Sequence, residues 1–137
     1  MDGSERESLL RNLDETTAVS GGRIHLATTG SLITLASRDG TELWRHSLGS
    51  APVTGVASSD GIVLVNQTFD QGPGGVPAYR ITALDAALGV PLWNLTAPST
   101  EYRRNLIAGE GKLVVLPNRS GTARVMDLFT GLSLIHI

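Results

Sequence analysis

Cysteine is absent from the sequence, and aromatic residues are scarce, at 4% of 137 residues. Without cysteine the chain forms no disulfide and offers no thiolate to a metal ion. Basic residues are not in excess either, since the formal net charge is −2. Binding to nucleic acid relies on a basic surface that contacts phosphates, so we expect no nucleic-acid partner.

Long hydrophobic runs are also missing, and no stretch approaches the length of a transmembrane helix. We therefore expect no membrane span within this chain. Hydrophobic residues nevertheless make up 41% of the sequence, which is typical of a folded domain and not of a disordered chain.

The sequence contains an internal repeat. The segments Leu35–Trp44 and Leu84–Trp93 place leucine, glycine, leucine and tryptophan in the same register. The two tryptophans of the chain lie about 50 residues apart, a period typical of solenoids and propellers. Because each tryptophan closes one copy, we expect the two indole rings to have the same structural role.

Each copy is predicted to contain short strands joined by tight turns. An alternating apolar run after a glycine marks the second strand of each copy, and the dipeptides Ser20-Gly21 and Asp60-Gly61 are typical of hairpin turns. The expected strands are Thr16–Val19, Gly22–Leu26, Leu32–Leu35 and Glu42–Leu48 in the first copy, Pro52–Ala57, Gly61–Val65, Arg80–Leu84 and Val90–Thr96 in the second, and Arg104–Ala108, Gly111–Val115 and Arg124–Leu128 in the third.

A single four-stranded unit buries too little apolar surface to be stable alone, and such units pack radially around an axis. The predicted fold class is therefore all-β, a partial β-propeller of about two to three four-stranded antiparallel blades. The glycine between the third and fourth strands is expected to adopt a positive φ, and the tryptophan to lie flat between neighbouring blades. The positions with these structural roles are Gly40, Trp44, Asp85, Gly89, Trp93, Asp127 and Gly131.

The repeat also divides the chain into segments. Residues 1–13 are expected to be an N-terminal linker, 14–48 the first blade, 49–97 the second, and 98–131 an incomplete third blade of three strands. Residues 132–137 match the in-frame translation of a common sequencing-library adaptor, so we expect a non-native tail; the alternative is a natural fourth strand. On this interpretation the chain is a fragment, and further blades of the parent propeller would adjoin it.

The segment Ala83–Asp85, followed by Gly89 and Trp93, resembles the pyrroloquinoline-quinone-like (quinoprotein-type) propeller repeat. The first copy departs from that pattern at Thr34 and Ala36, and the third copy has no tryptophan. The resemblance covers nearly the whole chain and implies the propeller fold. It does not imply one function, because propellers host unrelated activities.

The segment Ser37–His46 also resembles the first propeller blade of the large lumenal subunit of the endoplasmic-reticulum membrane protein complex. Bacterial repeats, including those of the lipoprotein of the outer-membrane β-barrel assembly machinery, frequently read Leu-Trp-Arg at the same place. These resemblances favour an extracytoplasmic location, in the periplasm, the cell envelope or the endoplasmic-reticulum lumen. Three glycosylation sequons, at Asn66, Asn94 and Asn118, are more than chance predicts and favour a eukaryotic lumenal parent; the alternative is that a turn-rich β protein places asparagine and threonine together without glycosylation.

Three functions remain open on this basis. The leading hypothesis is a non-catalytic scaffold that binds a protein or peptide partner. The alternatives are a quinone-dependent dehydrogenase and the lumenal propeller of a membrane-protein insertion complex. Quinone-dependent dehydrogenases carry calcium ligands, a catalytic aspartate and an adjacent-cysteine pair, and this chain matches none of these motifs, so we assign it no catalytic, cofactor-binding or metal-binding residue.

The second copy is longer than the others by about ten residues, which form a glycine- and proline-rich insertion, residues 69–79. In a meander this loop leaves the sheet at the same end as the connection to the third blade, residues 98–104. Loops on a rigid scaffold often carry recognition, and tyrosine and arginine are frequent at binding hot spots. We therefore predict an interaction rim, against the alternative of simple variation in loop length. The rim would consist of Phe69, Asp70, Tyr79, Tyr102, Arg103 and Arg104.

Histidines and aspartates in the repeats have structural explanations. No serine or carboxylate lies near His25 or His46 at the spacing of a catalytic triad or a metal site, so we expect these histidines at the surface or partly packed. Asp39 and Asp85 occupy hairpin positions, where a carboxylate accepts hydrogen bonds from the N–H groups of the turn.

Overall fold

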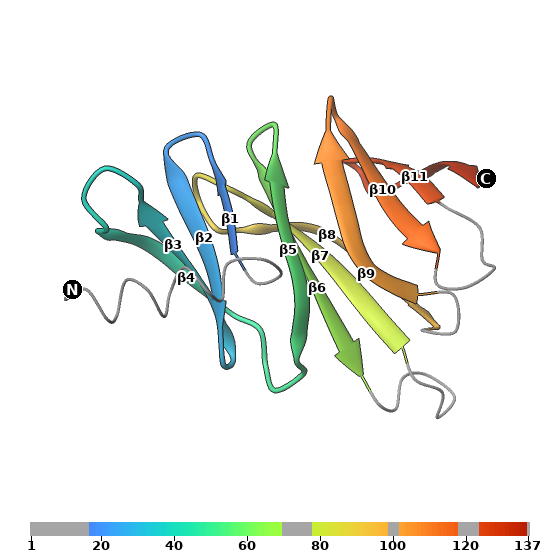
Figure 1. Ribbon diagram of the computed structural model, residues 1–137, viewed down its shortest axis with the longest axis horizontal. Helices are drawn as coiled ribbons and strands as arrows, with labels where there is room; N and C mark the ends of the chain where they lie inside the picture. Colours follow the sequence, from blue (N-terminus) through green and yellow to red (C-terminus); the bar gives the residue numbers. More distant parts are fainter. Residues whose placement is uncertain (1–16, 70–77, 99–101, 118–123, 137) are drawn as a thin grey trace.

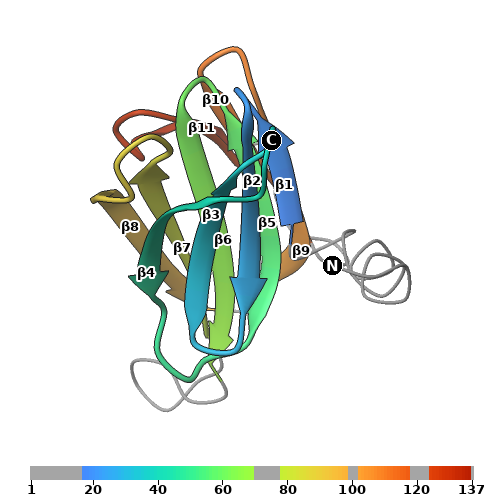
Figure 2. The same cartoon turned by 90° about the vertical axis from the view of Figure 1, so that its left-hand side faces the viewer.

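The computed structural model describes residues 17–69, 78–98, 102–117 and 124–136, and these residues contain the strands β1 to β12. The strands form three four-stranded antiparallel sheets in chain order, β1–β4, β5–β8 and β9–β12. Figures 1 and 2 show the sheets stacked side by side, and their first strands adjoin, β1 with β5 and β5 with β9. This arrangement of successive blades confirms the predicted all-β, partial propeller fold.

The strands have four to eight residues each, as expected of small propeller blades. Their bounds are β1 Thr17–Ser20, β2 Arg23–Thr28, β3 Ser31–Ala36, β4 Glu42–Ser47, β5 Val53–Ser59, β6 Ile62–Phe69, β7 Ala78–Asp85, β8 Pro91–Pro98, β9 Tyr102–Gly109, β10 Lys112–Pro117, β11 Arg124–Asp127 and β12 Ser133–His136.

The third blade differs from the expectation of three strands. β12 pairs antiparallel with β11, with Val125 opposite Ile135, so the blade has four strands. Residues 133–136, which were expected to belong to a non-native tail, occupy the place of the fourth strand. The physical reason is that β11 presents an unpaired edge, and the segment that follows it is apolar enough to pair there. Whether these residues are native stays a prediction.

The hairpin between the first two strands of each blade is a two-residue turn. Asp60 and Gly61 have φ values of 54° and 77°, and a type I′ turn requires a positive φ at both central residues. The predicted turn at Asp60-Gly61 is confirmed. In the first blade the turn residues are Gly21 and Gly22, because Ser20 is still the last residue of β1.

Two hydrophobic cores lie between the blades, and β6 contributes to both. Ile62 and Leu64 pack in the core towards the third blade, whereas Val63 and Val65 pack in the core towards the first. Successive side chains of a strand point to opposite faces, so a strand that is covered on both faces is apolar at every position. This explains the continuous apolar run in the second blade.

The indole of Trp44 packs between the first and second blades. Its Nε1 donates a hydrogen bond to the carbonyl oxygen of Ala86, at 2.8 Å, in the hairpin between β7 and β8. The indole lies so close to Gly89 that a Cβ there would be 2.5 Å from Trp44 Cδ2. Glycine is therefore required at this position both by its φ of 75° and by the ring that covers it.

Trp93 repeats these contacts one blade later. Its Nε1 donates a hydrogen bond to the carbonyl oxygen of Leu128, also at 2.8 Å, and its ring covers Gly131. The prediction that the two indoles have equivalent places between blades is confirmed. Gly40, the corresponding glycine of the first blade, has nothing within 4 Å of where a Cβ would stand.

Aspartates stabilise the hairpins between the third and fourth strands, as predicted for Asp85. One carboxylate oxygen of Asp85 accepts hydrogen bonds from two N–H groups of its turn, at 2.9 and 3.0 Å, and Asp127 does the same in the third blade. The first blade has Ala36 at this position. There Asp39 accepts hydrogen bonds from the hydroxyl and the N–H of Thr41, and these bonds lower the pKa of Asp39.

Candidate functional site

The strand ends that border the long segment of the second blade and the connections between blades lie at one end of the sheets. Phe69, the last residue of β6, is opposite Ala78 of β7, and Ala78 is opposite Pro98, the last residue of β8. The loop after β6 and the connection after β8 therefore leave the sheet at the same end, as the meander predicts. The connection from the first to the second blade, residues 48–52, lies at this end too (Figure 1).

The predicted rim residues are placed differently from one another. Tyr79 is only 5% exposed and packs in the core between the second and third blades, because β7 already begins before it. Its expected place on the rim surface is therefore wrong. Tyr102, Arg103 and Arg104 belong to β9 and not to a loop, and their side chains are outside what the structure describes. Asp70 also lies outside the described residues.

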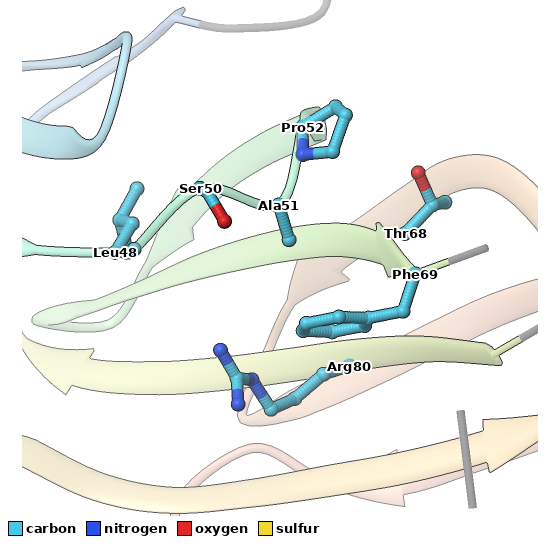
Figure 3. A pocket seen from close by; sticks show the side chains of 8 residues that line it. Leu48, Ser50, Ala51, Pro52, Thr68, Phe69 and Arg80 are labelled. Carbon is cyan, nitrogen blue, oxygen red and sulfur yellow. The ribbon is translucent and has the colours of Figure 1, made fainter. Parts of the chain in front are cut away.

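Phe69 lines a cleft of about 400 Å³ between the second blade and the connection that leads into it from the first. The connection 48–52 forms one wall, and Thr68, Phe69 and Arg80 form the other. Figure 3 shows the Phe69 ring and the Arg80 side chain next to one another across from this connection. The cleft thus combines a fixed backbone segment with one aromatic and one cationic side chain.

Among the described residues that line the cleft, Arg80 is the only charged one. Its guanidinium carbon lies over the Phe69 ring, 4.9 Å from the ring centroid, within the range of a cation–π interaction. Its Nη2 donates a hydrogen bond to Oε1 of Gln67 at 3.3 Å, and its Nε is buried without a hydrogen-bond partner among the described residues. Neither of the two ion pairs in the described part of the chain includes Arg80.

Gln67 connects Arg80 to the wall of the cleft. This side chain is fully buried, and its Nε2 donates hydrogen bonds to the carbonyl oxygens of Leu48 and Ala51, at 2.9 and 3.1 Å. Its Oε1 remains to accept the bond from Arg80. One buried amide therefore holds the connection between the blades and also orients the guanidinium.

Neither Gln67 nor Arg80 was predicted from the sequence as a site residue. The available indication was that Asn66 and Gln67 interrupt the apolar run of β6, since buried polar side chains are almost always hydrogen-bonded. The acceptors of Gln67 are backbone carbonyls that precede it by 19 and 16 residues. No pattern in the sequence identifies such partners.

His25 is placed differently from the expectation, because it is fully buried. Its Nδ1 lies 2.7 Å from the hydroxyl of Thr34, and its ring centroid is 6.0 Å from that of Trp44. Burial, with the nearby charge of Arg23, lowers the pKa of His25 from 6.5 to about 4, so the ring is neutral at pH 7. His46 is half-buried, as expected.

The sequons differ in accessibility. Asn66 is fully buried in β6, so the folded chain does not present it for glycosylation, whereas Asn94 is exposed on β8. Asn118 lies outside the described residues. Burial of Asn66 removes one of the three sequons that favoured a lumenal parent.

The described residues show neither a metal-binding cluster nor a membrane-spanning helix. Within residues 17–69, 78–98, 102–117 and 124–136, no three His, Asp or Glu side chains are grouped so as to hold a metal ion. The same ranges contain no helix that is long and apolar enough to cross a membrane.

Comparison with known proteins identifies a family. The family model described as outer membrane protein assembly factor BamB matches residues 4–135. No curated protein sequence matches the chain.

Solved structures with the same arrangement of strands include BamB from Moraxella catarrhalis, with a TM-score of 0.67 and 21% identity over 88% of this chain and 35% of that one. A europium-containing methanol dehydrogenase has a TM-score of 0.60 and 18% identity over 86% of this chain and 23% of that one. A quinohemoprotein alcohol dehydrogenase from Pseudomonas putida has a TM-score of 0.59 and 21% identity over 89% of this chain and 20% of that one. At such identities the likeness shows the fold, and the chain spans about a third or less of each protein.

Proposed function

The chain belongs to the family of the outer membrane protein assembly factor BamB, among the PQQ-like propellers, and from this premise we propose that it is part of a non-catalytic scaffold that holds a protein partner. The family match over residues 4–135 carries the proposal. It covers all three blades, so it includes the cleft beside the connection 48–52. An assembly factor acts by binding other proteins, which is the function that we infer for this chain.

The surface that we assign to the partner is the end of the blades where the cleft opens. Gly49 and Ser50 are exposed there, next to the half-buried Phe69. Backbone held by a rigid sheet beside one aromatic and one arginine side chain has the composition of a binding hot spot. Tyr102, Arg103 and Arg104 begin the neighbouring blade, and their part in the same surface stays a prediction.

An extracytoplasmic location forms part of the proposal. The description of the family as an outer-membrane assembly factor supports a location in the cell envelope, and the composition of the chain is compatible with it.

Site-specific photo-crosslinking in the native host tests the scaffold function. A photoreactive amino acid at Ser50, beside the cleft, is expected to crosslink one or a few proteins that mass spectrometry identifies repeatedly. The matched control places the same amino acid at Arg38, whose side chain is 88% exposed in a hairpin at the opposite end of the first blade. The same crosslinks from both positions, or none from Ser50, would contradict the proposed partner surface.

The two alternative functions are less well supported. The likeness to quinoprotein dehydrogenases rests on the fold, so a dehydrogenase remains the second candidate. Reduction of a dye by alcohols or sugars, after addition of quinone and calcium to the full-length protein, would establish it. The resemblance of residues 37–46 to the lumenal subunit of the endoplasmic-reticulum complex stays a prediction.

A further inference from the structure

We propose that the cleft between the connection 48–52 and the second blade binds the C-terminal residue of a partner protein, a carboxylate with an apolar side chain beside it, and that Arg80 is the cation that recognises the carboxylate. That the carboxylate comes from a protein rests on the proposed scaffold function. The pairing of Arg80 with an oxyanion does not, because it follows from the charge and geometry of the cleft.

The charge of Arg80 is not balanced by an acidic side chain in the part of the chain that the structure describes. Arg80 is half-buried, and its one hydrogen bond to a described side chain goes to the neutral amide of Gln67. A cation that is partly removed from water favours a nearby anion. The contrast is Arg45, which forms a 2.7 Å ion pair with Glu42 on the outer strand of the first blade.

Arg80 is also held in place before any ligand arrives. Gln67 is fixed by its bonds to the carbonyls of Leu48 and Ala51, and the Phe69 ring covers the guanidinium. A side chain that is ordered in advance loses little further freedom on binding. Guanidinium has five N–H donors in a planar fork, and among the described side chains only Gln67 accepts a hydrogen bond from it, through Nη2, so donors on the terminal nitrogens remain for a two-oxygen acceptor.

The rest of the cleft selects among oxyanions. Its volume of about 400 Å³ lies within the range of sites for small molecules and single side chains. The walls carry the apolar groups Leu48, Pro52 and Phe69, together with the hydroxyl groups of Ser50 and Thr68. Apolar walls favour a carboxylate that carries an aliphatic side chain over a bare, strongly hydrated ion such as phosphate.

Titration of the isotopically labelled chain by NMR tests the proposal with three probes. N-acetyl-leucine has the carboxylate and the aliphatic group, N-acetyl-leucinamide lacks the charge, and inorganic phosphate lacks the apolar group. We expect N-acetyl-leucine to shift the amide signals of residues 48–52 with a dissociation constant of about 1 mM, and the other two probes to bind about tenfold more weakly. Equal binding of N-acetyl-leucine and its amide would overturn the role of Arg80. Phosphate binding as tight as that of N-acetyl-leucine would overturn the selection of a peptide carboxylate.

Substitutions assign the effect to one residue. Arg80→Gln is expected to weaken N-acetyl-leucine about tenfold, and Arg80→Lys, which keeps the charge and loses the planar fork, to weaken it about fivefold. Arg45→Gln, the matched control, should leave binding unchanged. If Arg80→Gln does not fold, the lysine variant decides, and unchanged binding to it overturns the proposal. Carboxylate binding without crosslinks from Ser50 would contradict the scaffold function alone, and crosslinks without carboxylate binding would contradict this inference alone.

Discussion

Alanine at Gly89, compared with alanine at Gly40, tests whether the indole of one blade is seated on the hairpin glycine of the next. Both glycines occupy the same place in their hairpins, with φ values of 75° and 76°. A Cβ at Gly40 would have nothing within 4 Å, whereas one at Gly89 would lie 2.5 Å from the ring of Trp44. The two variants therefore share the backbone strain and differ in the contact with the indole.

The expected difference between the variants follows from these contacts. Alanine at a positive φ costs about 1 kcal/mol in each variant. At Gly89 the added methyl group also displaces the Trp44 ring, and overpacking of this kind costs about 1–3 kcal/mol. The displaced indole weakens its hydrogen bond to Ala86, which contributes about 1 kcal/mol. We expect Gly89→Ala to lower the free energy of unfolding by about 2–3 kcal/mol more than Gly40→Ala does.

Urea unfolding of the two variants and the parent chain, followed by far-ultraviolet circular dichroism, measures this difference. Gly131→Ala, beneath Trp93, is a second instance and should resemble Gly89→Ala. Equal destabilisation by Gly40→Ala and Gly89→Ala would refute the reasoning, because it would mean that the indole does not rest on the glycine.

Two further predictions concern pH. Acidification from pH 6.5 to about 4 should lower the free energy of unfolding by about 3 kcal/mol, because the pKa of His25 is about 4 in the folded chain and the unfolded chain binds the proton more readily. Leucine is the residue at the corresponding position of the next blade, Leu64, so His25→Leu keeps an apolar side chain there and should remove this loss of stability. Urea unfolding at several pH values measures the loss, and the same pH dependence in the variant and the parent chain would contradict the role of His25. Asp60 of the second blade accepts a hydrogen bond from the N–H of Gly111 in the third blade, and this bond lowers the pKa of Asp60. The free energy of unfolding should therefore decline as the pH falls below about 3.8, and the decline should be smaller for Asp60→Asn in the same assay. An equal decline in the variant and the parent chain would mean that this contact is absent in solution.

The blade architecture could be predicted because its determinants are local and repeated. A glycine recurs in the hairpin of every blade, an aspartate that binds its own turn recurs in the second and third, and a tryptophan after the glycine recurs in the first and second. The glycine and the aspartate act on their own turns, and each tryptophan marks its copy by its constant place after the glycine. The fourth strand of the third blade was not predicted because it lacks the tryptophan that marks the other two. β12 forms because the free edge of β11 is available for pairing.

The candidate site was predicted only in part. Phe69 was expected at the end of the long loop, and it does border the cleft. Tyr79 was expected beside it, although the second blade is covered on both faces and this tyrosine is enclosed in the core. Arg80 was treated only as the start of a strand, since the bonds that orient it come from a residue on the neighbouring strand.

By itself the sequence determined the order of the strands within a blade, the succession of blades along the chain and the two tryptophans that lie between them. It could do so because alternation along a strand and the backbone requirements of a turn are properties of adjacent residues. Only the tertiary structure decided which of the two faces of a strand is covered, that His25 stands where the next blade has Leu64, and that Gln67 joins Arg80 to the connection between blades. Those outcomes depend on the neighbouring sheet, whose distance and angle are set by the packing of two complete blades.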